Sequence, residues 1–133
     1  MIPAFNNSGC LPPGIHRATL AEIESCFGCQ SEIRRVQMES VRWMVELALR
    51  AGVQRIVLNG SFVTDIMEPN DVDCVLLLAA DYPQETGASD ELIKGLPFLE
   101  IARVELQEFD RLVHRFFATD RHGVVKGVIE ISL

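Results

Sequence analysis

Residues 55–80 read RIVLNGSFVTDIMEPNDVDCVLLLAA, and this stretch decides the fold and the function that we predict. It holds a short β-branched strand, the turn Gly60-Ser61, and a second strand that begins with the acidic pair Asp71 and Asp73. Beyond the two acids, nearly every position of the second strand is apolar, which is typical of a strand buried on both faces at the centre of a sheet. We therefore predict two adjacent strands with a polar turn between them.

The acidic pair predicts a site for a divalent metal ion. Residues i and i+2 of a strand point to the same face, so Asp71 and Asp73 lie side by side. Burying two unpaired carboxylates costs several kcal/mol, and a divalent cation would relieve that cost. Mg²⁺ prefers carboxylate, phosphate and water oxygens, and two such ions about 4 Å apart can serve phosphoryl or nucleotidyl transfer. The alternative makes Asp71 a turn residue and Asp73 a charge at the edge of the strand.

The turn Gly60-Ser61 predicts a phosphate-binding segment next to that pair. A glycine after a strand lets the backbone turn sharply and approach a ligand. If a helix begins at Ser61, its free amides and dipole favour a phosphate, and the hydroxyl adds a donor. Lys126 on the last predicted strand is a further candidate for binding a triphosphate, although a solvated lysine is the simpler interpretation.

The rest of the chain predicts an α+β fold in a single domain, residues 1–133. Residues 1–18 are rich in Pro and Gly and are expected to form an extended arm, followed by a capping box, Thr19 to Glu22, that starts a short helix. We expect further helices over 31–51 and 109–117, with a short one at 90–94, and strands over 55–58, 71–80, 98–107 and 124–132. This order predicts a two-layer arrangement: a mixed sheet of about four strands with helices packed on it.

Charge and hydropathy exclude several classes of function. The net charge is −7 and the pI is about 4.9, so general binding of nucleic acid has no electrostatic support. No apolar run reaches the ~20 residues that span a bilayer, and no secretory signal is present at the N-terminus, so we predict a cytoplasmic protein without membrane contact. Cys26 and Cys29 form a CxxC, but zinc would need two more ligands and a redox motif would need a preceding strand. Coincidence at a helix end is the favoured interpretation.

Gly-Ser, a spacer of about ten residues, and Asp-x-Asp on the following strand resemble the signature of the DNA polymerase beta-like nucleotidyltransferases. The segment 11–17, LPPGIHR, followed by a helix that ends in Phe-Gly, is similar to an uncharacterised bacterial group of small stand-alone members. The resemblance implies one or two Mg²⁺ ions, a nucleoside triphosphate donor and a nucleotidyltransferase-like fold. It also implies transfer of a nucleoside monophosphate, with AMP from ATP favoured, to a hydroxyl of a small molecule, protein or RNA. Small members include antibiotic adenylyltransferases and enzymes of toxin–antitoxin pairs that adenylylate a toxin.

The sequence departs from the family's pattern at the third acid of the site. The resemblance implies an Asp on the next strand as metal ligand and base, and the aligned residue here is Glu105. Glu105 is thus our candidate beside Asp71 and Asp73, while an exposed residue paired with Arg103 is an equal alternative. Glu100 and Glu130 are weaker candidates.

The absence of a third Asp supports an alternative function. The chain would then be a catalytically degenerate binding protein, such as an antitoxin-like partner of a protein encoded nearby. The small size also allows a homodimer or such a partner to complete the site.

Overall fold

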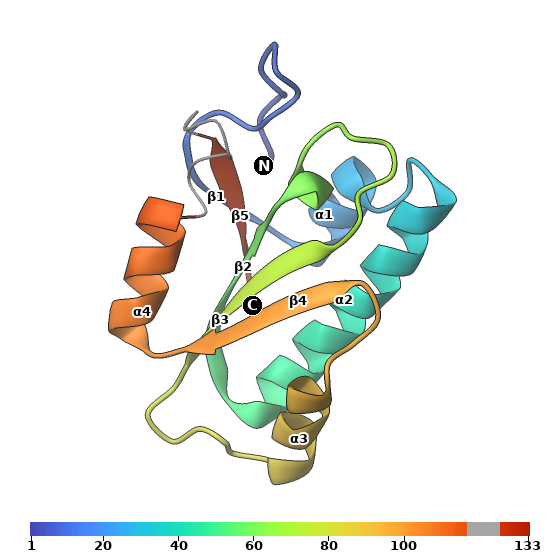
Figure 1. The fold of residues 1–133 in the computed structure, drawn as a ribbon. Coiled ribbons are helices and arrows are strands. Elements are labelled where there is room, and N and C mark those ends of the chain that lie inside the picture. The colour runs from blue at the N-terminus through green and yellow to red at the C-terminus, as the bar shows by residue number, and fades with distance from the viewer. Residues whose placement is uncertain (117–125) are drawn as a thin grey trace.

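The computed structural model describes residues 1–116 and 126–133, which form an α+β fold with an open, mixed sheet of five strands (Figure 1). The strands are β1 (Gly14–Ala18), β2 (Val53–Asn59), β3 (Val72–Leu78), β4 (Leu99–Val104) and β5 (Gly127–Ile131). They lie in the order β1-β5-β2-β3-β4, with β1–β5 and β3–β4 parallel and β5–β2 and β2–β3 antiparallel. The predicted α+β class and mixed sheet are confirmed, but the number of strands is five rather than four.

The additional strand is β1, which lies within the predicted N-terminal arm. Residues Gly14 to Ala18 pair in parallel with Gly127 to Ile131, one residue to one residue. The partner lies more than a hundred positions further along the chain, so no local pattern announces the pairing. The expectation of an extended arm over residues 1–18 is therefore wrong for its last five residues, which are part of the sheet.

Three helices lie beside one face of the sheet (Figure 1): α1 (Leu20–Phe27), α2 (Glu32–Ala51) and α3 (Thr86–Lys94). The predicted capping box of α1 is confirmed. The Thr19 hydroxyl accepts a hydrogen bond from the Glu22 amide, and the Glu22 carboxylate accepts one from the Thr19 amide. Helix α2 ends at Ala51 and is capped by Gly52, which adopts a φ of 93°, a left-handed conformation that suits glycine. No helix in the described ranges is both long and apolar enough to cross a membrane.

A fourth helix, α4 (Leu106–Arg111), covers part of the opposite face and continues into a π turn over Leu112–Phe116 (Figure 1). Phe109 and Val113 pack there on Val57, Val75 and Val128 in a second, smaller core. Helices thus lie on both faces, which corrects the predicted two-layer arrangement. The helix begins at residue 106 rather than 109, and the predicted positions 117 and 124–125 lie outside the described residues.

Strand alternation decides which side chains share the face of α4. Val75 and Leu77 of β3 belong to the core under α4, so Asp73 points to the same side of the sheet. On β2 the same alternation places Asn59 on the side of Val57. The polar end of β2 and the acidic start of β3 therefore meet on one face of the sheet.

Candidate functional site

The site is centred on Asp73, the second residue of β3, and its neighbours come from the two flanking strands. Asn59 at the end of β2 is its register partner on one side, and Glu100 of β4 is its partner on the other. Asp71 lies just before β3 and is exposed. The charge of Asp71 acts on Asp73, and Glu100 adds a second carboxylate from β4.

The carboxyl group of Asp73 is held in an unfavourable environment for its charge. Its pKa is raised from an ordinary value of 3.8 to about 6, mainly by burial and then by a hydrogen bond to Glu100 and the charges of Glu100 and Asp71. The positive charge of Lys126, which precedes β5, lowers the same pKa but does not outweigh the other causes. The negative charges of Glu100 and Asp71 thus act on Asp73, and the positive charge of Lys126 offsets them only in part.

Gly60 makes close approach of the backbone to Asp73 possible. It has a φ of 83°, and a Cβ atom at this position would lie 2.5 Å from Oδ2 of Asp73. Any side chain here would displace the carboxylate. Gly60 therefore lies against Asp73, and Ser61 begins a single 3₁₀ turn, Ser61–Val63.

Asn59 is a further polar residue at the site that sequence reasoning missed. Its side chain is buried, and its Oδ1 atom has no hydrogen-bond partner in the part of the chain that the structure describes. A buried amide oxygen without a partner calls for a water molecule or a cation. A polar residue that ends an apolar strand directly before glycine is the signal that could have indicated it.

Glu105 does not join the acid pair, and this corrects the predicted third ligand. In the parallel pairing of β3 with β4, Asp73 lies opposite Glu100, whereas Leu77, near the far end of β3, lies opposite Val104. Glu105 follows Val104 and precedes α4, about 16 Å along the strand from Glu100. It lines a different hollow, of about 530 Å³, with Leu77 and Tyr82. Glu100, which the sequence offers as a weaker candidate, is the acid of β4 that lies opposite Asp73, where Glu105 was expected.

Glu130, the other weaker candidate, is committed elsewhere. It is buried and forms a salt bridge to Arg55, with 2.5 Å between Oε1 and Nη2. The guanidinium of Arg55 also lies over the ring of Phe109, 4.9 Å from its centre. Glu130 therefore has an internal counterion and is no candidate for a metal ligand.

The donor set fits a metal ion that arrives with other ligands. Within residues 1–116 and 126–133, no three Asp, Glu, His or Cys side chains are grouped closely enough to hold a metal ion by themselves. Mg²⁺ in proteins usually takes only one or two carboxylates and completes its shell with phosphate oxygens and waters. Asp73 and Glu100, with Asp71 nearby and the unpartnered oxygen of Asn59, supply that kind of partial shell.

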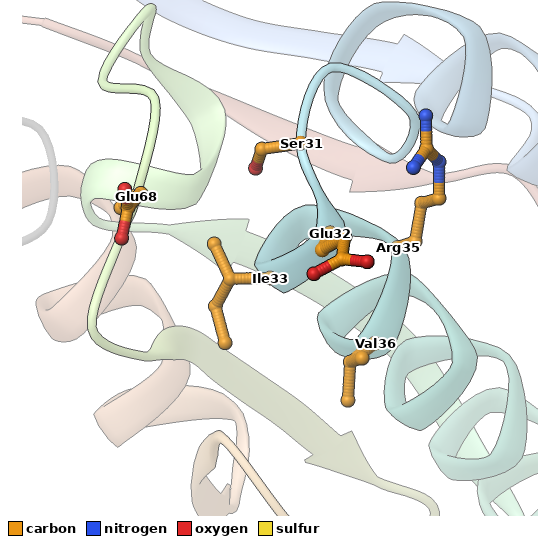
Figure 2. A pocket seen from close by; sticks show the side chains of 6 residues that line it. All are labelled: Ser31, Glu32, Ile33, Arg35, Val36 and Glu68. Atoms are coloured by element: carbon orange, nitrogen blue, oxygen red, sulfur yellow. The ribbon is translucent and has the colours of Figure 1, made fainter.

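The hollows on the surface separate the acid pair from a larger depression. Asp73 and Glu100 line a small one of about 260 Å³. A larger one, of about 810 Å³, lies at the start of α2, where Glu68 faces Ile33 and Val36 across it (Figure 2). None of the predicted site residues lines the larger hollow, whereas the carboxylates of Asp73 and Glu100 are at the smaller one.

The CxxC motif shows no link to this site. Cys26 and Cys29 are exposed free thiols at the end of α1, and Cys10 is also free. Burial raises the pKa of Cys26, with smaller contributions from the charges of Glu22 and Cys29, which disfavours the reactive thiolate. These observations agree with coincidence as the interpretation of the motif.

The fold and the site define a class: an α+β protein with an open mixed sheet that gathers acidic and amide side chains at one end of one face. The chain belongs to the family described as "Family of unknown function (DUF6932)", whose model matches residues 3–132. Comparison with curated proteins and with solved structures finds no match.

Proposed function

We propose that this protein is a Mg²⁺-dependent nucleotidyltransferase that transfers a nucleoside monophosphate, with AMP from ATP favoured, to a hydroxyl group. The observation that carries the proposal is the contact between Gly60 and Asp73, together with the second carboxylate, Glu100, opposite Asp73. A backbone turn without a side chain beside clustered carboxylates supports binding of a triphosphate through a metal ion. The nucleotidyltransferase-like fold is part of the same proposal.

Each residue has a role that follows from its place. Asp73, Asp71 and Glu100 would hold one or two Mg²⁺ ions, and the backbone at Gly60 and Ser61 would lie against the phosphates. When bound, Mg²⁺ supplies charge neutralisation for the phosphate oxygens and the leaving group. Lys126 would add a positive charge on the β5 side, where it already acts on Asp73.

The chemical step requires a base and a leaving group. The acceptor hydroxyl oxygen would attack the α-phosphorus, and the bond from phosphorus to the bridging oxygen of pyrophosphate would break. The hydroxyl proton would pass to Glu100, which lines the small hollow beside Asp73. Pyrophosphate would leave with the electron pair of the broken bond. Glu105 has no part in this proposal because it lies at the other end of β4.

A second candidate function has one observation in its favour. The described residues hold no complete set of three metal ligands, and Glu100 is longer than the Asp that the resemblance implies. A catalytically degenerate protein that binds a nucleotide or a protein partner, such as an antitoxin-like partner of a protein encoded nearby, fits that observation. Self-association into a homodimer is a further arrangement that would complete the site.

One experiment separates the two functions. The protein is incubated with Mg²⁺ and triphosphates labelled at the α-phosphate, alone and with the product of the neighbouring gene. Label transfer by the wild type and by Glu105→Gln, but not by Asp73→Asn, supports the enzyme. Metal-dependent nucleotide binding without transfer supports the binding protein. If the wild type binds no nucleotide in the presence of Mg²⁺, both functions are wrong.

A further inference from the structure

Arg34, the third residue of α2, is buried at 2% exposure beneath the segment that follows Gly60. Within residues 1–116 and 126–133, its guanidinium donates hydrogen bonds only to backbone carbonyl oxygens. Nε donates to the carbonyl of Ile66 at 2.9 Å. Nη1 donates to the carbonyls of Phe27 at 2.9 Å and Phe62 at 2.7 Å. Nη2 donates to the carbonyls of Ser61 at 3.3 Å and Thr64 at 2.8 Å, and also to that of Ile66. Four of the five acceptor residues lie between positions 61 and 66.

A buried arginine without a carboxylate partner is costly, so the carbonyl groups must compensate for its charge. Among the described residues Arg34 forms no salt bridge, although the charge of Asp65 acts on it. Burial nevertheless lowers the pKa of Arg34. The burial of the guanidinium charge and the backbone conformation of the segment 61–66 are therefore coupled, because both depend on the same hydrogen bonds.

The same hydrogen bonds orient the peptide planes directly after Gly60. In a trans peptide the N–H points away from the preceding C=O. Because the carbonyls of Ser61 and Phe62 point toward Arg34, the amides of Phe62 and Val63 point away from it. The Val63 amide donates to the carbonyl of Gly60 at 3.2 Å. Arg34 thus determines the orientation of the turn whose glycine lies against Asp73.

Two more side chains on the same side of α2 hold the residues that follow the segment 61–66. Ser31 donates from Oγ to the carbonyl of Met67 at 2.8 Å, and Gln37 donates from Nε2 to the carbonyl of Pro69 at 2.6 Å. Figure 2 shows the side chain of Ser31, at the start of α2, on the side that faces the chain around Glu68, and both residues line the larger hollow. Positions 31, 34 and 37 repeat every three residues and so lie along one side of the helix.

We propose that Arg34 is a positioning residue for the nucleotide site: it holds residues 61–66 so that Gly60, directly before them, stays against Asp73. This inference rests on the proposed function for its consequence but not for its geometry. Lysine at position 34 keeps the charge, yet its point-like ammonium cannot serve carbonyls on several sides as the planar guanidinium does. The segment would then lose its fixed orientation while the carboxylates on β3 and β4 remain in place.

The test compares Arg34→Lys with Arg42→Lys. Arg42 is an exposed arginine of the same helix whose partner is Glu24, far from the segment. Amide hydrogen exchange is measured over residues 61–66 and over β2 and β3 in the absence of ligand. For Arg34→Lys we expect exchange at 61–66 to rise at least about tenfold while the strands stay protected. For Arg42→Lys we expect no change in either region.

The same variants are then assayed with ligands. For Arg34→Lys we expect ATP affinity in the presence of Mg²⁺ to fall by about tenfold, while the affinity for Mn²⁺ alone stays within about twofold of the wild type. If transfer is detected, KM for ATP should rise more than kcat falls. A purely structural role would instead weaken metal and nucleotide binding together, in proportion to lost folded protein, and that result would overturn the proposal.

A second variant covers the case in which Arg34→Lys does not fold. Thr64 donates from its hydroxyl to the carbonyl of Ser61 at 2.7 Å and accepts from the Ile66 amide, so Thr64→Val loosens the same segment and leaves Arg34 in place. We expect the same changes at a smaller size. Unchanged exchange over 61–66 in the variant that folds would overturn the positioning role. If the wild type binds no triphosphate, the proposed function fails, and the exchange measurement still decides whether Arg34 holds the segment.

Discussion

Two carboxylates on the α4 face of the sheet, Glu130 and Asp73, have opposite electrostatic surroundings. Toward one end of this face, Glu130 is buried and has its own counterion, Arg55, which also lies over Phe109. Toward the other end, Asp73 lies opposite a second carboxylate, Glu100. We call these the paired end and the acid end. Folding alone explains the paired end, because charge and counterion come from the same chain. The acid end is unfavourable for folding, and under the proposed function a metal ion would offset that cost.

The largest effect is expected from Glu100, the acid of β4 opposite Asp73. If Glu100 belongs to the acid end, Glu100→Gln should lower the transfer rate by about 100- to 1,000-fold, which corresponds to about 3–4 kcal/mol of transition-state stabilisation. Glu105→Gln, its matched control five residues further on, should stay within about twofold. Single-turnover transfer of labelled nucleotide measures both. The opposite ranking would contradict the register on which the acid end rests.

The paired end should respond through stability instead. Glu130→Ala leaves Arg55 without its carboxylate under Phe109, and we expect a loss of about 3 kcal/mol in the free energy of unfolding. Urea unfolding measures it. The double variant Arg55→Met, Glu130→Leu should recover most of that loss because no unpaired charge remains. A single variant as stable as the wild type would show that the salt bridge does not hold the paired end together.

Metal binding at the acid end should depend on pH. A proton and a cation compete for Asp73, whose pKa is about 6 without metal. The affinity for Mn²⁺ should therefore fall by about tenfold for each pH unit below 6 and level off above 7. Titration followed by the electron spin resonance of free Mn²⁺ measures this. An affinity that is constant between pH 5 and 7 would separate Asp73 from the metal.

The smallest effect concerns the stability of the protein without metal. Because the pKa of Asp73 is higher in the folded state than in the unfolded state, its ionisation destabilises the fold progressively from about pH 4 to pH 6 and fully above that. Asp73→Asn should therefore stabilise the metal-free protein at pH 8 by about 1 kcal/mol, a value reduced for the half-exposed side chain. The gain should vanish near pH 4. Thermal unfolding at both pH values tests this, and a destabilised variant at pH 8 would contradict an acid end that opposes folding.

Local signals explain why much of the fold was predictable. The Thr19–Glu22 box, the glycine that ends α2 and the apolar strand β3 each depend on neighbours in the sequence, and the structure confirms all three. Strand β1 was missed because its pairing partner is β5, and pairing between distant segments leaves no periodic pattern in either one.

The candidate site was predictable only in part, for the same physical reason. Gly60, Asp71 and Asp73 are close in sequence, so their spacing carries the information. Glu100 rather than Glu105 lies opposite Asp73 because the register of β4 on β3 depends on packing across the sheet. Arg34 resembles any polar residue of an amphipathic helix, and only the path of the segment 61–66 makes it a buried residue.

The position of β5 has a consequence for synthesis on the ribosome. This strand follows the other four in the sequence, yet it lies between β1 and β2. While the chain is being made, β2, β3 and β4 can pair, but β1 must wait because its partner in the sheet is β5. Until then the edge of β2 is open, and an open strand edge can pair wrongly with another chain. Lys126 arrives with the same strand, so the site gains its positive charge only when the sheet is completed.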